Sequence, residues 1–94
     1  MVTLESYIEH LFFERGIILN ETTMEMLIEK ELGVNLRKLS GMMLAVSRKF
    51  KITVIFGWHL EIKTVRDFVD YCINHQLTTD AYQSIPDSVG VKTR

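Results

Sequence analysis

An unbroken apolar row in the middle of the chain constrains the fold more than any other feature. The row advances in steps of three, four, three and four residues through Leu36, Leu39, Met43, Val46 and Phe50. Such steps place side chains on one face of an α-helix. Asn35 precedes the row and is a favourable N-cap residue. We therefore predict a helix over residues 36–50 that buries one face in the core.

Two further segments have helical periodicity and start signals of their own. Apolar residues recur at three- and four-residue steps over residues 4–15, after Thr3 as an N-cap and before Gly16 as a stop. The same pattern follows Thr64, which opens a T-x-x-D cap, and it ends near residues 75–77. These segments predict a first and a last amphipathic helix.

Shorter signals lie between the predicted helices. Thr22 opens a T-x-x-E capping box, which predicts a short helix or helical turns that end at Gly33. Residues 52–56, ITVIF, have the composition of a strand, but the chain has no second run of similar strength to pair with it. We therefore interpret this run as an apolar connector that Phe56 and Trp58 anchor to the core.

These elements predict an all-α protein, a small antiparallel four-helix bundle with three long helices and one short helix. A chain of 94 residues suits a single domain of this kind. We assign the helical domain to residues 1–77. Residues 78–94 are polar, hold the only proline of the chain and have no periodicity, so we expect a flexible tail there.

Charge is distributed unevenly along the chain. Residues 1–31 hold seven acids and two bases, whereas residues 32–51 hold five bases and no acid. The formal net charge is only −1, so the chain as a whole has no electrostatic reason to bind nucleic acid or a membrane. The five bases lie at the two ends of the predicted 36–50 helix. The leading pair, Arg37 and Lys38, opposes the helix dipole, which indicates a use for positive charge there.

Several classes of function lack the residues that they require. The chain has no nucleophile motif, no histidine–carboxylate pair beside a nucleophile and no glycine-rich phosphate loop, so we expect no enzymatic activity. His10, His59, Cys72 and His75 do not have the spacing of a zinc site, so we expect no metal. The single cysteine fits a reducing cytoplasm. We expect a monomer without a leader or a membrane span.

Several short motifs within residues 3–77 resemble one protein family in order and separation. The matching positions are Gly16-Ile17, Thr23, Ile28, Glu31-Leu32-Gly33, Leu36, Phe50, Thr64-Val65, Asp70-Tyr71 and His75-Gln76. Their order resembles that of the acyl carrier protein family, including the fourteen residues from Leu36 to Phe50. The resemblance implies the four-helix fold of that family and an association with fatty-acid, polyketide or related lipid assembly.

The chain departs from that family at the attachment site. The family has Asp-Ser-Leu after the glycine, and its serine receives the phosphopantetheine arm. Here the same positions read Asn35-Leu36-Arg37. Leucine has no hydroxyl, so we expect no phosphopantetheine cofactor. The family's second helix is also typically acidic and meets basic enzymes, whereas this helix is basic and would repel such partners.

We therefore hypothesise a non-enzymatic, protein-binding module or degenerate carrier of this type. The partner-binding residues would be Leu36, Arg37, Lys38, Arg48 and Lys49, facing an acidic surface on a synthase or ligase component. Leu36 has two interpretations. It either continues the buried row and covers the end of the bundle, or it is an exposed apolar contact ringed by charge.

Other interpretations remain open. The chain is alternatively a divergent but functional carrier modified at Ser40, one turn beyond Leu36. A third interpretation is a core that encloses an apolar ligand without a covalent bond, lined by Met42, Met43 and the aromatic residues of the connector. Gly41 costs a helix interior roughly 1 kcal/mol relative to alanine. We interpret it as a close approach of a neighbouring helix, with a hinge as the alternative.

Overall fold

The computed structural model describes residues 2–77 of the chain, and the predicted tail over 78–94 lies outside the described residues. Four α-helices and one 3₁₀ helix follow in order: α1 Leu4–Phe13, α2 Glu21–Met24, α3 Leu36–Phe50, η1 Trp58–Glu61 and α4 Val65–Asn74. The described residues form no strand, only two isolated β-bridges. The structure therefore confirms an all-α protein with three long α-helices and one short α-helix.

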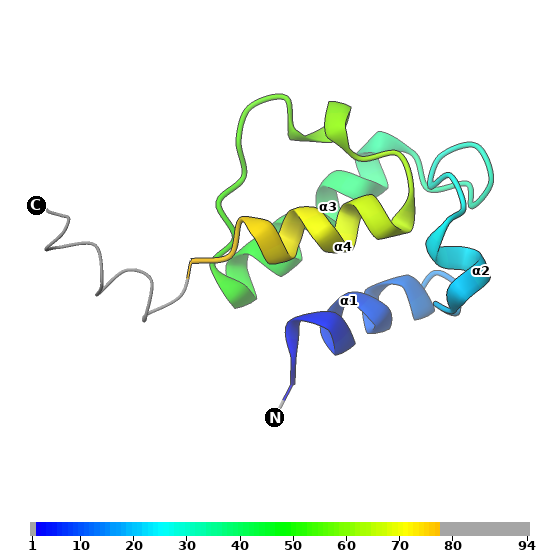
Figure 1. Ribbon diagram of the computed structural model, residues 1–94, viewed down its shortest axis with the longest axis horizontal. Coiled ribbons are helices and arrows are strands. Elements are labelled where there is room, and N and C mark those ends of the chain that lie inside the picture. Colours follow the sequence, from blue (N-terminus) through cyan, green and yellow to red (C-terminus); the bar gives the residue numbers. More distant parts are fainter. Residues whose placement is uncertain (1, 78–94) are drawn as a thin grey trace, which may run out of the picture.

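The predicted antiparallel arrangement is only partly right, because two of the three long helices run in the same direction (Figure 1). α1 runs opposite to α3 and α4, whereas α3 and α4 run the same way (Figure 1). A bridge between Ile52 and Gln76 places the residues after α3 beside the residues after α4, which agrees with this direction. α1 packs against both α3 and α4, and α2 packs against α4. Residues 51–64 make the long connection that a parallel pair requires.

The core lies where the three long helices meet. Its largest fully buried side chains include Phe12 from α1 and Phe68 from α4, whose rings meet edge to face with centroids 5.8 Å apart. The fully buried Val46 comes from α3. Each long helix thus contributes one buried face, as the apolar periodicity predicts.

The predicted starts of the long helices are confirmed. The Thr3 side chain accepts a hydrogen bond from the backbone N–H of Ser6 at 3.1 Å, and Asn35 Oδ1 accepts one from Lys38 at 2.9 Å. Thr64 and Asp67 form the predicted capping box of α4. α1 ends at Phe13, two residues before the predicted end. Caps and apolar periodicity are local features, so the sequence alone suffices to place them.

The segment between α1 and α3 differs from its prediction. The short helix begins at Glu21, and its N-cap is Asn20 rather than Thr22. Asn20 Oδ1 accepts hydrogen bonds from the backbone N–H groups of Thr22 and Thr23, each at 2.9 Å. Asparagine is at least as good a cap as threonine, so the helix starts at the earlier residue. The chain then continues in turns to Gly33, which has a φ of +72°.

The apolar connector after α3 is confirmed as non-strand, but its anchoring differs from the prediction. Trp58 is half-buried, with its ring centroid 6.5 Å from that of the buried Tyr71. Phe56, in contrast, is fully exposed, so its predicted role as a core anchor is wrong. The Tyr71 hydroxyl accepts a hydrogen bond from the backbone N–H of Ile55 at 3.0 Å. Gly57 then turns the chain at a φ of +86°, which directs Trp58 inward and leaves Phe56 in solvent.

Gly41 also departs from its prediction. It is exposed, and apart from α3 itself no atom of the described residues lies within 4 Å of the position that a Cβ would occupy. The predicted close approach of a neighbouring helix is therefore wrong within this fold. Gly41 lies on the outer face of α3, opposite the face that carries the buried Leu39, Met43 and Val46.

The cap of α4 predicts a pH dependence of stability. Asp67 Oδ2 accepts hydrogen bonds from the backbone N–H groups of Thr64 and Lys63, each at 3.0 Å. These bonds, that of Thr64 first, hold the pKa of Asp67 below its ordinary value, although partial burial opposes them. The unfolded carboxyl titrates at about 4. The stabilisation is therefore present above that pH and lost as the pH falls through the lower folded pKa.

We expect Asp67→Asn to lower the free energy of unfolding by about 0.5–2 kcal/mol at pH 7, because a neutral amide oxygen accepts the two backbone hydrogen bonds less strongly than a carboxylate does. Below pH 4 the difference from the wild type should shrink. Urea denaturation between pH 3 and 7 measures both effects. Asp70→Asn, at an exposed position on the same helix, is the matched control. An Asp67→Asn difference that stays constant with pH would show that the ionised carboxylate does not stabilise the cap.

Candidate functional site

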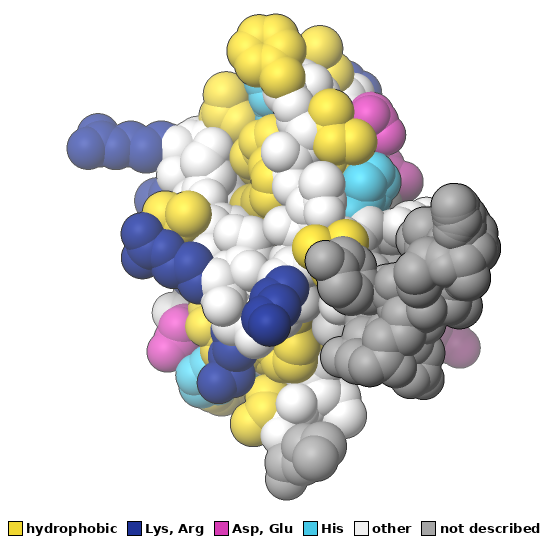
Figure 2. All heavy atoms as spheres, turned by 90° about the vertical axis from the view of Figure 1, so that its left-hand side faces the viewer, with side chains coloured by type: hydrophobic (Ala, Val, Ile, Leu, Met, Phe, Trp, Pro, Cys, Tyr) yellow, Lys and Arg dark blue, Asp and Glu magenta, His cyan; other side chains and the backbone are white. Residues whose placement is uncertain are grey.

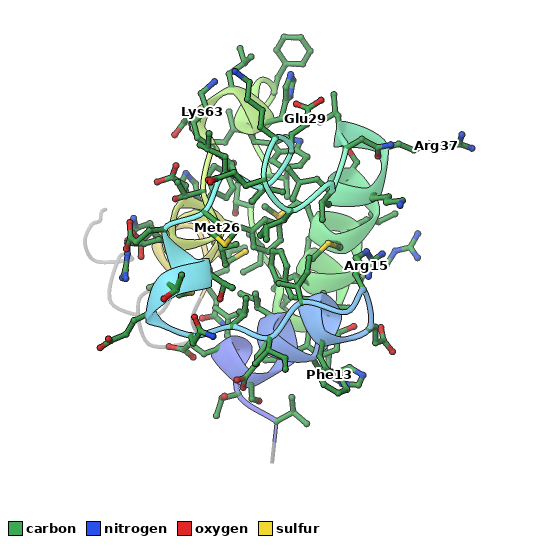
Figure 3. The ribbon with its side chains drawn as sticks, turned by 90° about the vertical axis from the view of Figure 1, so that its right-hand side faces the viewer. Phe13, Arg15, Met26, Glu29, Arg37 and Lys63 are labelled. Carbon is green, nitrogen blue, oxygen red and sulfur yellow. The ribbon has the colours of Figure 1, made fainter. Side chains whose placement is uncertain are left out.

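The outer face of α3 carries most of the residues that the sequence predicts for partner binding. Arg37 and Lys38 lie in its first turn and Arg48 in its last, and all three side chains are exposed. Figure 3 shows Arg37 extending away from the ribbon into solvent. The two arginines are eleven residues apart, or about 16 Å along the helix axis. The face therefore presents positive charge at both of its ends.

The bases of α3 form no ion pair among the described residues. The pairs present there join His10 to Glu14 within α1, and Arg66 on α4 to Glu25. In the space-filling view, several lysine and arginine side chains stand out on the left of the molecule, with no acidic side chain among the upper ones (Figure 2). The positive charge of this face is thus not neutralised by the folded domain.

Leu36 begins α3 on the side of the core row, not on the outer face, and is 47% exposed. The interpretation that Leu36 is buried as a continuation of the core row is therefore wrong. The row becomes buried one turn later, at Leu39, which is 5% exposed. The exposed interpretation agrees with the structure, and the first turn of α3 thus combines one apolar side chain with two cations.

Lys49 is the predicted binding residue that the structure places elsewhere. Its Nζ lies over the ring of Tyr7, 5.5 Å from the centroid, and the same ring lies 5.6 Å from that of Phe50. A cation over an aromatic face is a stabilising contact. Lys49 is therefore directed toward α1, and we assign it to the contact between α1 and α3 rather than to the outer face.

An open groove of about 440 Å³ adjoins the head of α3. It lies between the turns that follow α2, the start of α3 and the η1 segment. Its apolar lining consists of Leu27, Ile28, Val34, Leu36, Leu39, Leu60 and Ile62. Glu29, Lys30, His59 and Lys63 complete the lining. Figure 3 shows Glu29 and Lys63 at the upper end of the molecule, where this groove lies.

This groove is a different site from the cavity inside the core that the third interpretation assumes. Met42 and Met43 are 1% and 2% exposed and pack in the core, and neither lines the groove. Phe56 does not line it either. Leu60 and Ile62 line the groove instead, from a segment in which the sequence has no helical periodicity. The local sequence does not identify Leu60 and Ile62 as lining residues, because the path of the long connection after α3 is what brings them to the groove.

Ser40 is exposed on the outer face of α3, one turn beyond Leu36. Its neighbours Leu39 and Gly41 are not acidic, so Ser40 lacks the aspartate that precedes the attachment serine in acyl carrier proteins. The other serine of α3 is Ser47, whose Oγ donates a hydrogen bond to the carbonyl oxygen of Leu44 at 2.9 Å. Because Ser40 is exposed, solvent can reach its side chain.

The remaining titratable groups are dispersed over the fold. Within residues 2–77 no group of three or more His, Cys, Asp or Glu side chains is placed to hold a metal ion.

Burial raises the pKa of the Cys72 thiol to about 12. The His75 ring stacks on that of Tyr71 with centroids 3.9 Å apart. Among the described residues, no helix has the length and apolar character needed to cross a membrane.

Comparisons with known proteins identify no relative. No protein-family model, no curated protein and no solved structure matches the chain. The resemblance to acyl carrier proteins therefore rests on the quoted residues alone. The basic outer face of α3 and the groove beside it are the two surface features of the described residues that suggest a function.

Proposed function

We propose that this chain is an acyl-carrier-protein-like bundle that works as a non-enzymatic docking module, in the setting of fatty-acid, polyketide or related lipid assembly. The resemblance of its motifs supports the family and the setting. The loss of the attachment serine at Leu36 supports a role other than carrying a phosphopantetheine arm. The partner is a protein with an acidic surface.

The single observation that carries the proposal is the unneutralised outer face of α3. Exposed cations at both ends of one helix attract an acidic surface from a distance and orient it before contact. An exposed apolar side chain in the same first turn as two of them then supplies a contact that excludes water. Arg37, Lys38 and Arg48 have the first role in this mechanism, and Leu36 has the second.

We expect the double variant Arg37→Glu/Lys38→Glu to bind its partner at least about tenfold more weakly than the wild type, because attraction becomes repulsion. Partners enriched by the wild-type chain from its native cell extract would be identified by mass spectrometry and then purified. Isothermal titration calorimetry with the purified partner measures the Kd at two salt concentrations.

The matched control is Lys30→Glu/Lys63→Glu, which changes the net charge equally but on the groove. It should leave the Kd within about twofold of the wild type. An unchanged Kd for Arg37→Glu/Lys38→Glu, or an equal loss in the control, would reject docking through α3.

The groove favours a second candidate function, the non-covalent binding of an apolar ligand. Seven apolar residues line an open volume large enough for a small hydrocarbon chain. Native mass spectrometry of the purified protein would detect such a ligand as added mass. Leu60→Glu, which places a charge in the lining at an exposed position, should abolish that mass.

A modified carrier is the remaining alternative. Incubation with coenzyme A and a broadly specific phosphopantetheinyl transferase, followed by intact mass measurement, tests it. We expect no increase in mass. An increase that peptide mapping assigns to Ser40 would replace the docking module with a functional carrier.

A further inference from the structure

Gly41 occupies a position at which this fold does not need glycine. It lies in the interior of α3, where glycine is the least favourable residue after proline. Its φ is not positive, so its backbone conformation suits any residue. Within the described residues, the space where a Cβ would project is open. Neither the backbone nor the packing of the domain therefore accounts for it.

The residues around Gly41 form one row on the outer face of α3. Arg37, Gly41, Leu44 and Arg48 follow one another in steps of four, three and four residues. All four are exposed, Leu44 by 51%. The row thus has an arginine at each end. Between the two arginines lie Gly41, which has no side chain, and the exposed Leu44.

We infer that a helix of the acidic partner crosses α3 at Gly41. This inference rests on the proposed docking function and names the form of the partner at that site. Packed helices usually lie 8–10 Å apart, at a distance set by the side chains at the crossing. A missing side chain at Gly41 allows a closer approach, and Leu44 packs into the surface of the crossing helix. Carboxylates on both sides of the crossing point meet Arg37 and Arg48.

Charge favours an acidic helix over a second copy of this chain. Two α3 helices crossing at Gly41 would bring arginines of one copy toward arginines of the other. Like charges across an interface disfavour association. A helix with carboxylates about 16 Å apart, the separation of Arg37 and Arg48 along the axis, reverses the sign of that interaction.

The probe for this crossing is a stapled helical peptide about five turns long, with glutamates at both ends of an alanine–leucine centre. A twin peptide carries lysines in place of the glutamates. We expect the glutamate peptide to shift the NMR amide resonances of α3 between Arg37 and Arg48, and the lysine twin to shift none of them. Gly41→Ala should weaken the Kd of the glutamate peptide roughly tenfold, because its methyl group occupies the contact. The same variant should raise the Tm.

Asn74→Ala is the matched control. It replaces an exposed residue of α4 with a better helix former, so it raises the Tm and leaves the Kd unchanged. If Gly41→Ala binds the peptide as tightly as the wild type while Arg37→Glu weakens binding, the crossing is wrong and docking through α3 stands. If neither variant weakens binding, or if the shifts map to Leu60 and Ile62 on the far side of the groove and not to α3, both are wrong. Self-association in sedimentation velocity that Gly41→Ala abolishes would make a second copy the occupant and overturn the inference.

Discussion

Phe12→Ala is expected to lower the free energy of unfolding by about 3–5 kcal/mol. The Phe12 side chain is completely buried, and its ring meets the edge of the equally buried Phe68 ring. Alanine therefore removes an aromatic contact and leaves a cavity where α1 packs against α4. Small domains are stable by only about 5–15 kcal/mol, so this variant should lose a large share of the stability of the domain. Urea denaturation followed by circular dichroism measures the loss.

Phe13→Ala is the matched control for this prediction. Phe13 is the next residue of α1 and is 61% exposed. Its replacement should change the free energy of unfolding by no more than about 0.5 kcal/mol. The two variants remove the same atoms from adjacent positions. The difference between their losses of unfolding free energy therefore measures the effect of burial. Equal losses would contradict the packing of α1 described above.

The second large effect concerns the reactivity of Cys72. The side chain is completely buried, and burial raises the pKa of its thiol to about 12. At pH 8 the thiolate is therefore about a thousandfold scarcer than in a free cysteine, and the reagent is excluded as well. We expect Ellman's reagent to leave Cys72 unmodified in the native protein and to modify it at once in guanidinium chloride.

The control for Cys72 is the variant Cys72→Ala/Asn74→Cys. It moves the thiol two residues along α4 to an exposed position. This variant should react within seconds to minutes under native conditions. A native Cys72 that reacted as fast as the control would show that the C-terminal part of α4 opens readily. Such a result would revise the core rather than assign a function to the cysteine.

Local features of the sequence predicted most of the helical framework. Thr3, Asn35 and Thr64 each cap the helix that they were predicted to cap. The physical reason is that an N-cap side chain bonds to a backbone N–H group only two or three residues later, so a short segment contains both partners. The predicted cap at Thr22 is wrong for an equally local reason, since Asn20 competes with it and binds two backbone N–H groups.

The candidate site was only partly predictable. The charge of α3 is visible in the sequence, and Arg37, Lys38 and Arg48 are exposed as expected. The groove beside α3 was not predicted, because leucines in a connector give the same apolar signal as side chains that pack in the core. Phe56 and Trp58 show the same limit, since one is exposed and the other half-buried although both are aromatic residues of one connector.

The order of apolar residues and caps along the chain was enough to establish three helices and the face that each buries, and the charged residues themselves showed that α3 is basic. These properties depend on spacings of three or four residues, which the covalent chain imposes. Which end of the apolar row is exposed, what lines the groove and whether Gly41 has a neighbour depend on contacts between separate segments of the chain. The packing of the helices alone determines those contacts, because no spacing within one segment records where another segment will lie.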